Sequence, residues 1–431
     1  MPQVRDLFFE EFYEEFERVI RSLKGVEEGA HLPKLSKEVA DRWINYVFKP
    51  PENDATLISV DGGVQFSDFA YGGFIATGRG CALINAQGRG QRMARRVKIY
   101  VGEVFDDRDR HNIPSYLRSI TEYEAAKDAS ERVIEEGGKP LVLMDGSLYF
   151  SRFPYAIHDY QHHPTLMAEL FEAVSSLYRL SVDEGFPLLA VSKDSTVFYL
   201  NMELLKEAAL RAGLKKIIPL LEEASSPYDL RLRMVDWKPE DREAIEPFLD
   251  AKPLCDISLI EHSVSKTGFS IPLLLAPSIY YGGEDIPAFY SRIKRVVGGV
   301  LADRVISALN AFFSTPGIMV TYFKPTLDAR PLRVDLAAST LGLKEKCRSR
   351  KERAFIDERL SLDALTRILD HLGYWFCNEV EYNLPLHQAD KVARFDRDLY
   401  KSVYEPYMIE RLKEAGLDTV GRRRVLREVE P

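Results

Sequence analysis

The chain has 431 residues, 45% of them hydrophobic, and its 58 Lys and Arg against 66 Asp and Glu give a net charge of −8. This composition argues against intrinsic disorder, and no apolar run approaches the roughly 18 residues of a membrane span. The four cysteines form no CxxC pair, which argues against a zinc ribbon or a disulfide framework. No secretory signal pattern is visible, so we expect a cytoplasmic globular protein that binds no membrane.

The predicted elements begin with an amphipathic helix over 7–23 and a second helix over 35–48, which Pro50 and Pro51 end. We place a boundary here, between an N-terminal helical segment over 1–52 and a main domain over 53–431. Short apolar strands are predicted over 56–60, 67–77, 81–85, 97–105, 141–144, 188–192 and 332–336. Helices are predicted over 120–136, 165–184, 202–212 and 362–372. Strands with helices between them predict an α/β or mixed α+β fold.

Several common catalytic motifs are absent. The sequence contains no GxxxxGK[ST], and no GxGxxG opens a helix, which argues against a Walker-type ATPase and a dinucleotide-binding unit. HExxH and GxSxG are also absent, so the commonest zinc-protease and serine-hydrolase signatures are missing. Any chemistry must therefore depend on carboxylates.

Two acids stand at the ends of apolar strands, each followed by glycine: Asp61 and Asp145. The carboxyl ends of strands in an open α/β sheet face the functional crevice. Two carboxylates meeting there repel each other unless a cation lies between them, and Mg²⁺ or Mn²⁺ suits such oxygen ligands. An Asp-Gly pair is also a common turn former, so a purely structural role is the alternative.

A third acid is needed to complete such a site. The predicted helix over 120–136 offers Glu122 and Glu124. Most helical glutamates are simply exposed to solvent, and the composition of the helix does not favour either one.

In this order, VDGG at 60–63, the glutamate-containing helix and LMDGSL at 143–148 resemble the NurA nucleases of archaea and some bacteria. The resemblance extends to VSK at 191–193 and to YNLPLHQAD at 382–390, which is similar to the family's Tyr-x-x-Pro-Leu-x-x-Ala-His element. The motifs together span about 56–395. The resemblance implies a homodimeric, manganese-dependent DNA nuclease with an RNase H-like mixed sheet and helical elaborations, acting beside the hexameric translocase HerA in the resection of broken DNA ends.

The resemblance also implies roles for individual residues. Asp61, Glu124 and Asp145 would be metal ligands, with Glu122 as the fallback for the helix acid. Mn²⁺ is the expected ion and Mg²⁺ the alternative.

Three further residues are implied by the resemblance. Lys193 would hold a phosphate or stabilise charge that develops on it. Tyr382 and Asp390 would line the site, Asp390 as a further metal ligand. Many members have His where this chain has Asp390, and an Asp binds a cation but is no cationic acid. His387 lies in the wrong register to replace that histidine, so we interpret it as a bystander.

Three histidines lie close together at 158, 162 and 163. His158 and His162 have the i,i+4 spacing that chelates a metal when the segment is helical. Because Pro154 and Pro164 flank the segment, we favour a polar loop near the DNA path over a metal site.

The predicted reaction is metal-dependent hydrolysis of DNA: 5′→3′ exonuclease action on single- and double-stranded ends, with endonuclease action on single strands. One alternative is a nucleotide phosphotransferase with an actin-like fold, which would need a second matching half that the sequence lacks. The other is a non-catalytic DNA-end scaffold. ATP consumption by the isolated chain or a lack of cleavage would favour these alternatives.

Overall fold

The protein is described from a computed structural model, which covers residues 9–23, 32–51, 55–69, 72–85, 92–150, 153–154, 156–276, 285–347, 353–356 and 362–416. The strands are β1 (Trp43–Asn45), β2 (Ala55–Asp68), β3 (Gly73–Asn85), β4 (Arg92–Glu103), β5 (Lys139–Asp145), β6 (Leu188–Ser192), β7 (Gly268–Ser270), β8 (Leu273–Leu274), β9 (Ile318–Lys324), β10 (Leu332–Ala337) and β11 (Ala354–Phe355).

The α-helices of these residues come before, between and after the strands. They are α1 (Phe9–Leu23), α2 (Ser36–Asp41), α3 (Asp109–Glu135), α4 (Ile157–His162), α5 (Pro164–Glu184), α6 (Tyr199–Arg211), α7 (Ile218–Glu223), α8 (Pro227–Arg233), α9 (Pro239–Ile245), α10 (Asp256–Ser263), α11 (Ile286–Val297), α12 (Gly299–Phe313), α13 (Asp363–Tyr374), α14 (Leu384–Ala393), α15 (Arg397–Leu399) and α16 (Glu405–Glu414). None of them is long and apolar enough to span a membrane.

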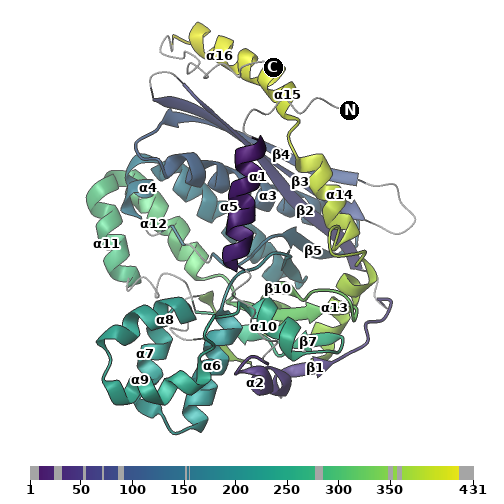
Figure 1. Cartoon of the computed structure of the whole chain (residues 1–431). Helices are drawn as coiled ribbons and strands as arrows, with labels where there is room; N and C mark the ends of the chain where they lie inside the picture. The colour runs from purple at the N-terminus through teal and green to yellow at the C-terminus, as the bar shows by residue number, and fades with distance from the viewer. Residues whose placement is uncertain are drawn as a thin grey trace.

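All strands of the described residues join one mixed sheet, ordered β1-β7-β9-β10-β6-β5-β2-β3-β4, with β8 beside β9 and β11 beside β8 (Figure 1). The long strands β2, β3 and β4 pair antiparallel, whereas β5 and β6 run parallel to β2. This order of three antiparallel strands followed by two parallel ones confirms the predicted α/β fold with a mixed sheet, and it is the order expected of an RNase H-like core.

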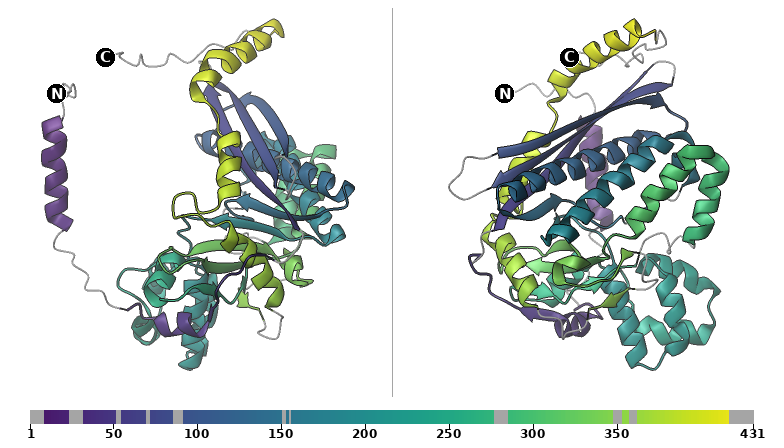
Figure 2. Two further views of the ribbon diagram at one scale, coloured as in Figure 1. Left: turned by 90° about the vertical axis from the view of Figure 1, so that its right-hand side faces the viewer. Right: turned by 180° about the vertical axis from the view of Figure 1, so that it is seen from behind.

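Helices cover both faces of the sheet. On one face α3 packs on β2 and β3, α5 packs on α3, and α12 packs on α5, as the rear view in Figure 2 shows. Alternate residues of β2 and β5, such as Val60 and Met144, point into this core. On the other face α14 packs on β2 and β3, and Leu57 and Leu143 join a second core with α13. The period-two alternation of buried strands thus supplies two apolar layers.

The N-terminal prediction is partly wrong. Helix α1 matches the amphipathic segment; it stands apart from the body in Figure 2, and its aromatic side chains are exposed. The second predicted helix ends at Asp41, and the chain then forms β1, in which Trp43 pairs with Ser270 of β7. Residues before 52 therefore already belong to the main sheet. Local periodicity could not reveal this pairing, because the partner strand lies more than 200 residues away.

Candidate active site

The two strand-end acids lie side by side. Strands β2 and β5 are parallel and pair in register up to Val60 opposite Met144, and the next residue on each strand is Asp61 and Asp145. Residues at the same register of parallel strands point to the same face of the sheet. Asp61 is buried, and burial raises its pKa to about 7; Arg118 opposes this shift, while the negative charges of Asp145 and Glu122 add to it.

Helix α3 contributes an acid and a cation to this edge. Arg118 Nη2 donates to Asp61 Oδ1 at 2.8 Å, and its Nε donates to Glu122 Oε1 at 2.6 Å, so the guanidinium bridges two carboxylates. Glu122 is buried, and burial raises its pKa, opposed by Arg118. The spacing of Arg118 and Glu122 is i,i+4, which places both side chains on one face of the helix. We call Asp61, Glu122 and Asp145 the acid site.

Glycines bring α3 this close to the sheet. A Cβ atom on Gly62 would lie 2.7 Å from Glu122 Oε1 and 2.9 Å from Arg118 Cγ, so these two side chains fill the space that a residue at 62 would need. A Cβ on Gly80 would come within 2.7 Å of the Glu122 backbone nitrogen, and one on Gly78 within 2.8 Å of the Leu117 carbonyl carbon. Because these three positions have no side chains, α3 lies close enough to the sheet for Glu122 to stand beside Asp61.

Glu124 lies elsewhere. It lines a separate hollow with Arg96, Lys98, Lys127 and further polar residues of α3 and α5. Two residues along an α-helix rotate a side chain by about 200°, so Glu122 and Glu124 point to different sides of α3. The structure therefore brings Glu122, the fallback residue, to Asp61 and does not bring Glu124 there.

Tyr382 reaches Asp145 from the face of the sheet that is opposite to α3. Its hydroxyl donates a short hydrogen bond to Asp145 Oδ1, and its ring is buried. Burial, followed by the charge of Asp145, raises the pKa of Tyr382 far above its ordinary value. Its position is set by the start of α14, where the Asn383 side chain accepts from Leu386 N at 3.2 Å and Pro385 occupies the first turn.

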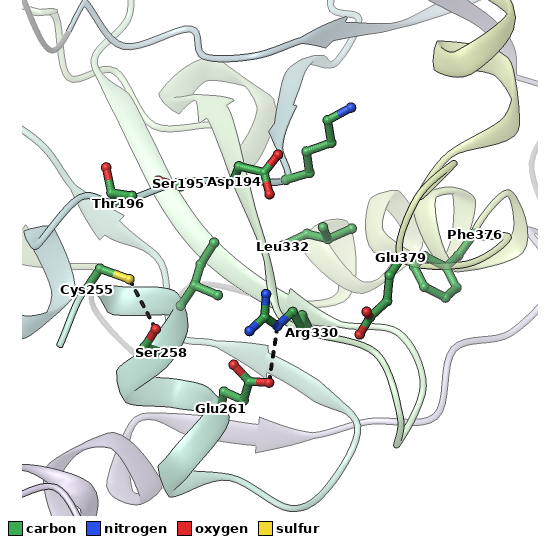
Figure 3. A pocket seen from close by; sticks show the side chains of 12 residues that line it. Asp194, Ser195, Thr196, Cys255, Ser258, Glu261, Arg330, Leu332, Phe376 and Glu379 are labelled. Atoms are coloured by element: carbon green, nitrogen blue, oxygen red, sulfur yellow. Dashed lines mark hydrogen bonds and ion pairs between the residues drawn. The ribbon is translucent and has the colours of Figure 1, made fainter. Parts of the chain in front are cut away.

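Lys193 lies beside Tyr382. It follows β6, whose Val191 pairs with Asp145, and its Nζ lies 5.1 Å from the centroid of the Tyr382 ring. Lys193 also lines a pocket of about 270 Å³ whose labelled side chains, among them Arg330 and Glu379, are drawn in Figure 3. Within this pocket Arg330 Nε lies 3.4 Å from Glu261 Oε1. The pocket is therefore adjacent to the acid site and is lined by two positively charged side chains, Lys193 and Arg330.

The remaining predicted residues lie further out. Asp390 is half-buried and accepts from Arg394 Nη2 at 2.8 Å, and its charge contributes to the raised pKa of Tyr382. His387 Nε2 lies 3.2 Å from Glu381 Oε1, in a partly exposed pair. Asp390 is therefore at the periphery of the acid site, and His387 is paired with another acid.

Sequence reasoning missed the network that supports Asp145. On β10, Arg333 donates from Nε to Asp335 Oδ1 at 2.7 Å, and both side chains are buried. Asp335 Oδ2 also accepts from Ser147 Oγ at 2.7 Å and from the Leu148 amide at 3.0 Å. A buried ion pair on a neighbouring strand therefore holds the turn that directly follows Asp145.

Arg118 was also missed, although its i,i+4 spacing to Glu122 was a readable signal. The spacing alone does not separate the two acids, because Lys127 stands three residues after Glu124.

A comparison with known families supports the resemblance of the sequence motifs. The family model described as NurA domain matches residues 55–349, more than half of the chain. Neither the comparison with curated proteins nor that with solved structures gave a match. The matched range contains the acid site, Lys193 and the Arg333–Asp335 pair, and it ends before Tyr382.

Proposed function

The chain belongs to the NurA family, and from this premise we propose that it is a metal-dependent DNA nuclease whose centre is Asp61, Glu122 and Asp145. The observation that carries the proposal is the convergence of three carboxylates, from β2, α3 and β5, on one edge of the sheet around Arg118. Glu122 takes the place first given to Glu124.

The donor set fits a hard divalent cation. Asp61 and Glu122 are buried, and Arg118 supplies one positive charge against three carboxylates. Clustered buried carboxylates are stabilised by a cation, and all-oxygen ligands suit Mn²⁺ and Mg²⁺. When bound, such an ion supplies a water of lowered pKa and stabilises charge on the phosphate. Burial is the main cause of the raised pKa of Asp61, to about 7, and a bound cation would favour its charged form.

The other residues bind and orient. The Tyr382 hydroxyl holds one oxygen of Asp145 and so fixes the rotamer of that carboxylate. Lys193 Nζ would hold a non-bridging phosphate oxygen, and Arg330 in the adjoining pocket would attract the neighbouring phosphate of the strand. The Arg333–Asp335 pair keeps the turn after Asp145 in place. Asp390 would act from the periphery, through Tyr382, or as an outer ligand.

We further propose 5′→3′ exonuclease action on DNA ends, endonuclease action on single strands, and partnership with a HerA-type translocase. The activity would reside in a homodimer with Mn²⁺ as the ion. Support comes from the family and, for a partner or dimer surface, from the exposed aromatic residues Phe12 and Phe16 of α1. Of the expected N-terminal segment over 1–52, only α1 would form a separate unit, because β1 already pairs with β7 in the main sheet.

The test is cleavage of end-labelled single- and double-stranded DNA in Mn²⁺. Asp61→Ala should abolish cleavage while circular dichroism and the oligomeric state stay unchanged. Retained manganese-dependent cleavage in that variant contradicts the proposed centre. A wild-type chain that binds DNA ends but cuts none of these substrates, with or without the translocase, supports the non-catalytic scaffold instead.

A further inference from the structure

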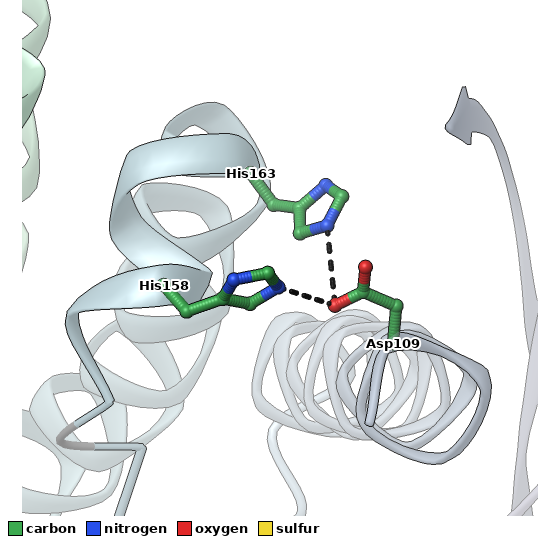
Figure 4. Close-up of side chains that lie close together, drawn as sticks. All are labelled: Asp109, His158 and His163. Carbon is green, nitrogen blue, oxygen red and sulfur yellow. Dashed lines mark hydrogen bonds and ion pairs between the residues drawn. The ribbon is translucent and has the colours of Figure 1, made fainter. Parts of the chain in front are cut away.

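A second group of ligating side chains lies away from the acid site. Asp109, His158 and His163 offer one carboxylate oxygen and two imidazole nitrogens, all within 4.8 Å of one another (Figure 4). Asp109 begins α3, His158 is on α4, and His163 joins α4 to α5. Glu122 follows Asp109 by thirteen positions along α3, or about 20 Å at 1.5 Å per residue. We call these three residues the histidine cluster.

Hydrogen bonding explains only part of the cluster. Asp109 is fully buried, and its Oδ2 accepts from the backbone amides of Phe105 at 2.8 Å and Asp106 at 3.1 Å. Its Oδ1 faces His158 Nε2 at 2.9 Å. His163 Nε2 lies 3.6 Å from the same oxygen, too far for a hydrogen bond.

His163 is therefore left with an unsatisfied atom. The residue is 1% exposed, and its Nε2 has no hydrogen-bond partner among the described residues. Asp159, on α4 between the two histidines, likewise has a buried Oδ1 without a partner, although its Oδ2 accepts from Tyr116 at 2.7 Å. Buried polar atoms of this kind are costly unless a ligand or a water satisfies them.

The surroundings orient His163 for coordination. Its Nδ1 lies 3.0 Å from the Tyr100 hydroxyl. When Nδ1 carries the proton, it donates a hydrogen bond to the Tyr100 hydroxyl, and Nε2 keeps its lone pair and faces Asp109. A hydrogen bond from the second ring nitrogen is usual for metal-binding histidines. The His162 ring stacks on Phe105, with the centroids 4.1 Å apart, beside the cluster.

We propose that Asp109, His158 and His163 bind one zinc-class ion, which joins α4 to the first turn of α3. Two imidazoles with one carboxylate suit Zn²⁺, whereas the all-oxygen acid site suits Mn²⁺ or Mg²⁺. Because Asp109 and His163 are buried, substrate does not reach the ion, and its role is structural. The pair that coordinates is His158 with His163, not the i,i+4 pair His158 with His162 that the sequence spacing indicated.

The first test uses the full chain, stripped with chelator and titrated with Zn²⁺ in excess Mg²⁺ so that the acid site is filled. Elemental analysis after gel filtration should find one zinc per chain, and zinc should raise the melting temperature. Substitution with Co²⁺ should give a visible absorption band of nitrogen-containing, low-coordinate geometry. A wild-type chain that retains no zinc and shows no such band overturns the proposal and leaves a His158–Asp109 ion pair.

Variants then identify the ligands. His163→Ala should lose the zinc and its effect on melting, whereas His162→Ala and Glu122→Gln should each retain one zinc per chain. Stoichiometric zinc in a folded His163→Ala variant, or loss of zinc from His162→Ala alone, overturns the assignment. If His163→Ala does not fold, Tyr100→Phe decides: it leaves all three ligands, and should weaken zinc binding about 10- to 100-fold. Unchanged affinity in Tyr100→Phe contradicts the proposed coordination.

Discussion

The acid site and the histidine cluster each include one residue of α3, Glu122 and Asp109, but they differ in how their charges are satisfied. In the acid site, Arg118 places a guanidinium between Asp61 and Glu122, so the chain carries a cation of its own there. In the histidine cluster, His163 Nε2 stays without a hydrogen-bond partner within the described part of the chain. From this difference we expect the acid site to fold without an ion and to need one only for the proposed chemistry, whereas the histidine cluster would need its proposed ion for stability.

The largest expected effect is a loss of cleavage when a carboxylate of the acid site is neutralised. Asp61→Asn and Glu122→Gln should each lower Mn²⁺-dependent cleavage by about three orders of magnitude, about 4 kcal/mol of transition-state stabilisation, because each loses an anionic ligand. Glu124→Gln is the matched control on the same helix and should cleave at nearly the wild-type rate. Rates on labelled single-stranded DNA measure this. A strong loss in Glu124→Gln with normal activity in Glu122→Gln would reverse the assignment.

The next effect concerns the buried pair that supports Asp145. Arg333→Met should lower the free energy of unfolding by about 3 kcal/mol, because Asp335 then stays buried with only neutral donors. Arg330→Met, three residues earlier, removes a largely exposed ion pair and should cost less than about 0.5 kcal/mol. Chemical denaturation followed by circular dichroism compares the two. Equal stabilities would mean that the Arg333–Asp335 pair does not support this turn.

A smaller effect tests the close approach of α3. Gly80→Ala should destabilise the protein by about 2 kcal/mol and lower cleavage, because the added Cβ meets the helix backbone at Thr121 and Glu122. In Gly102→Ala the added Cβ meets only the rings of Tyr100 and Phe74, which can shift, so the loss should be smaller. Thermal unfolding and activity together measure this. A Gly80→Ala variant that equals Gly102→Ala in both would show that α3 does not depend on glycine at this contact.

The smallest expected effect concerns Arg118, whose positive charge distinguishes the acid site from the histidine cluster. Arg118→Met should lower the free energy of unfolding in chelator by about 1–2 kcal/mol, a modest value because the Arg118 side chain is 40% exposed. Mn²⁺ should restore much of this loss, because the ion replaces the missing cation between the acids. Melting temperatures with chelator and with Mn²⁺ give the result. An equal Mn²⁺ response in the wild type and the variant would show that Arg118 does not stand where the ion binds.

Sequence patterns predicted the strand-end acids but not the helix acid. An apolar strand, an Asp and a Gly are local features, so Asp61 and Asp145 could be read directly, and their parallel pairing confirms that they share one sheet edge. The choice between Glu122 and Glu124 depends on which side of α3 faces the sheet. That is decided by Gly62, Gly78 and Gly80, which lie far from the helix in the sequence and contact it only in the fold.

Other features depend on still more distant contacts. Strand β1 forms because β7 supplies its partner, and the apolar spacing around Trp43 is equally compatible with a helix. The histidine cluster joins Asp109 to residues some 50 positions later, and His163 stands just before Pro164, at a boundary between two helices. Pro164 was read as a reason to doubt a helix, but it is the first residue of α5, where proline is favoured.

Helix α3 is a single 27-residue rod that begins in one cluster and contributes to the other midway along its length. The contacts at Gly62, Gly78 and Gly80 clamp its middle turns to the sheet independently of its first turn. Unwinding of the first turn of α3 at Asp109 should therefore not extend to Glu122. With little zinc in the cell, we then expect a protein that melts at a lower temperature and keeps the proposed nuclease activity. With little manganese, we expect a protein of normal stability that lacks this activity.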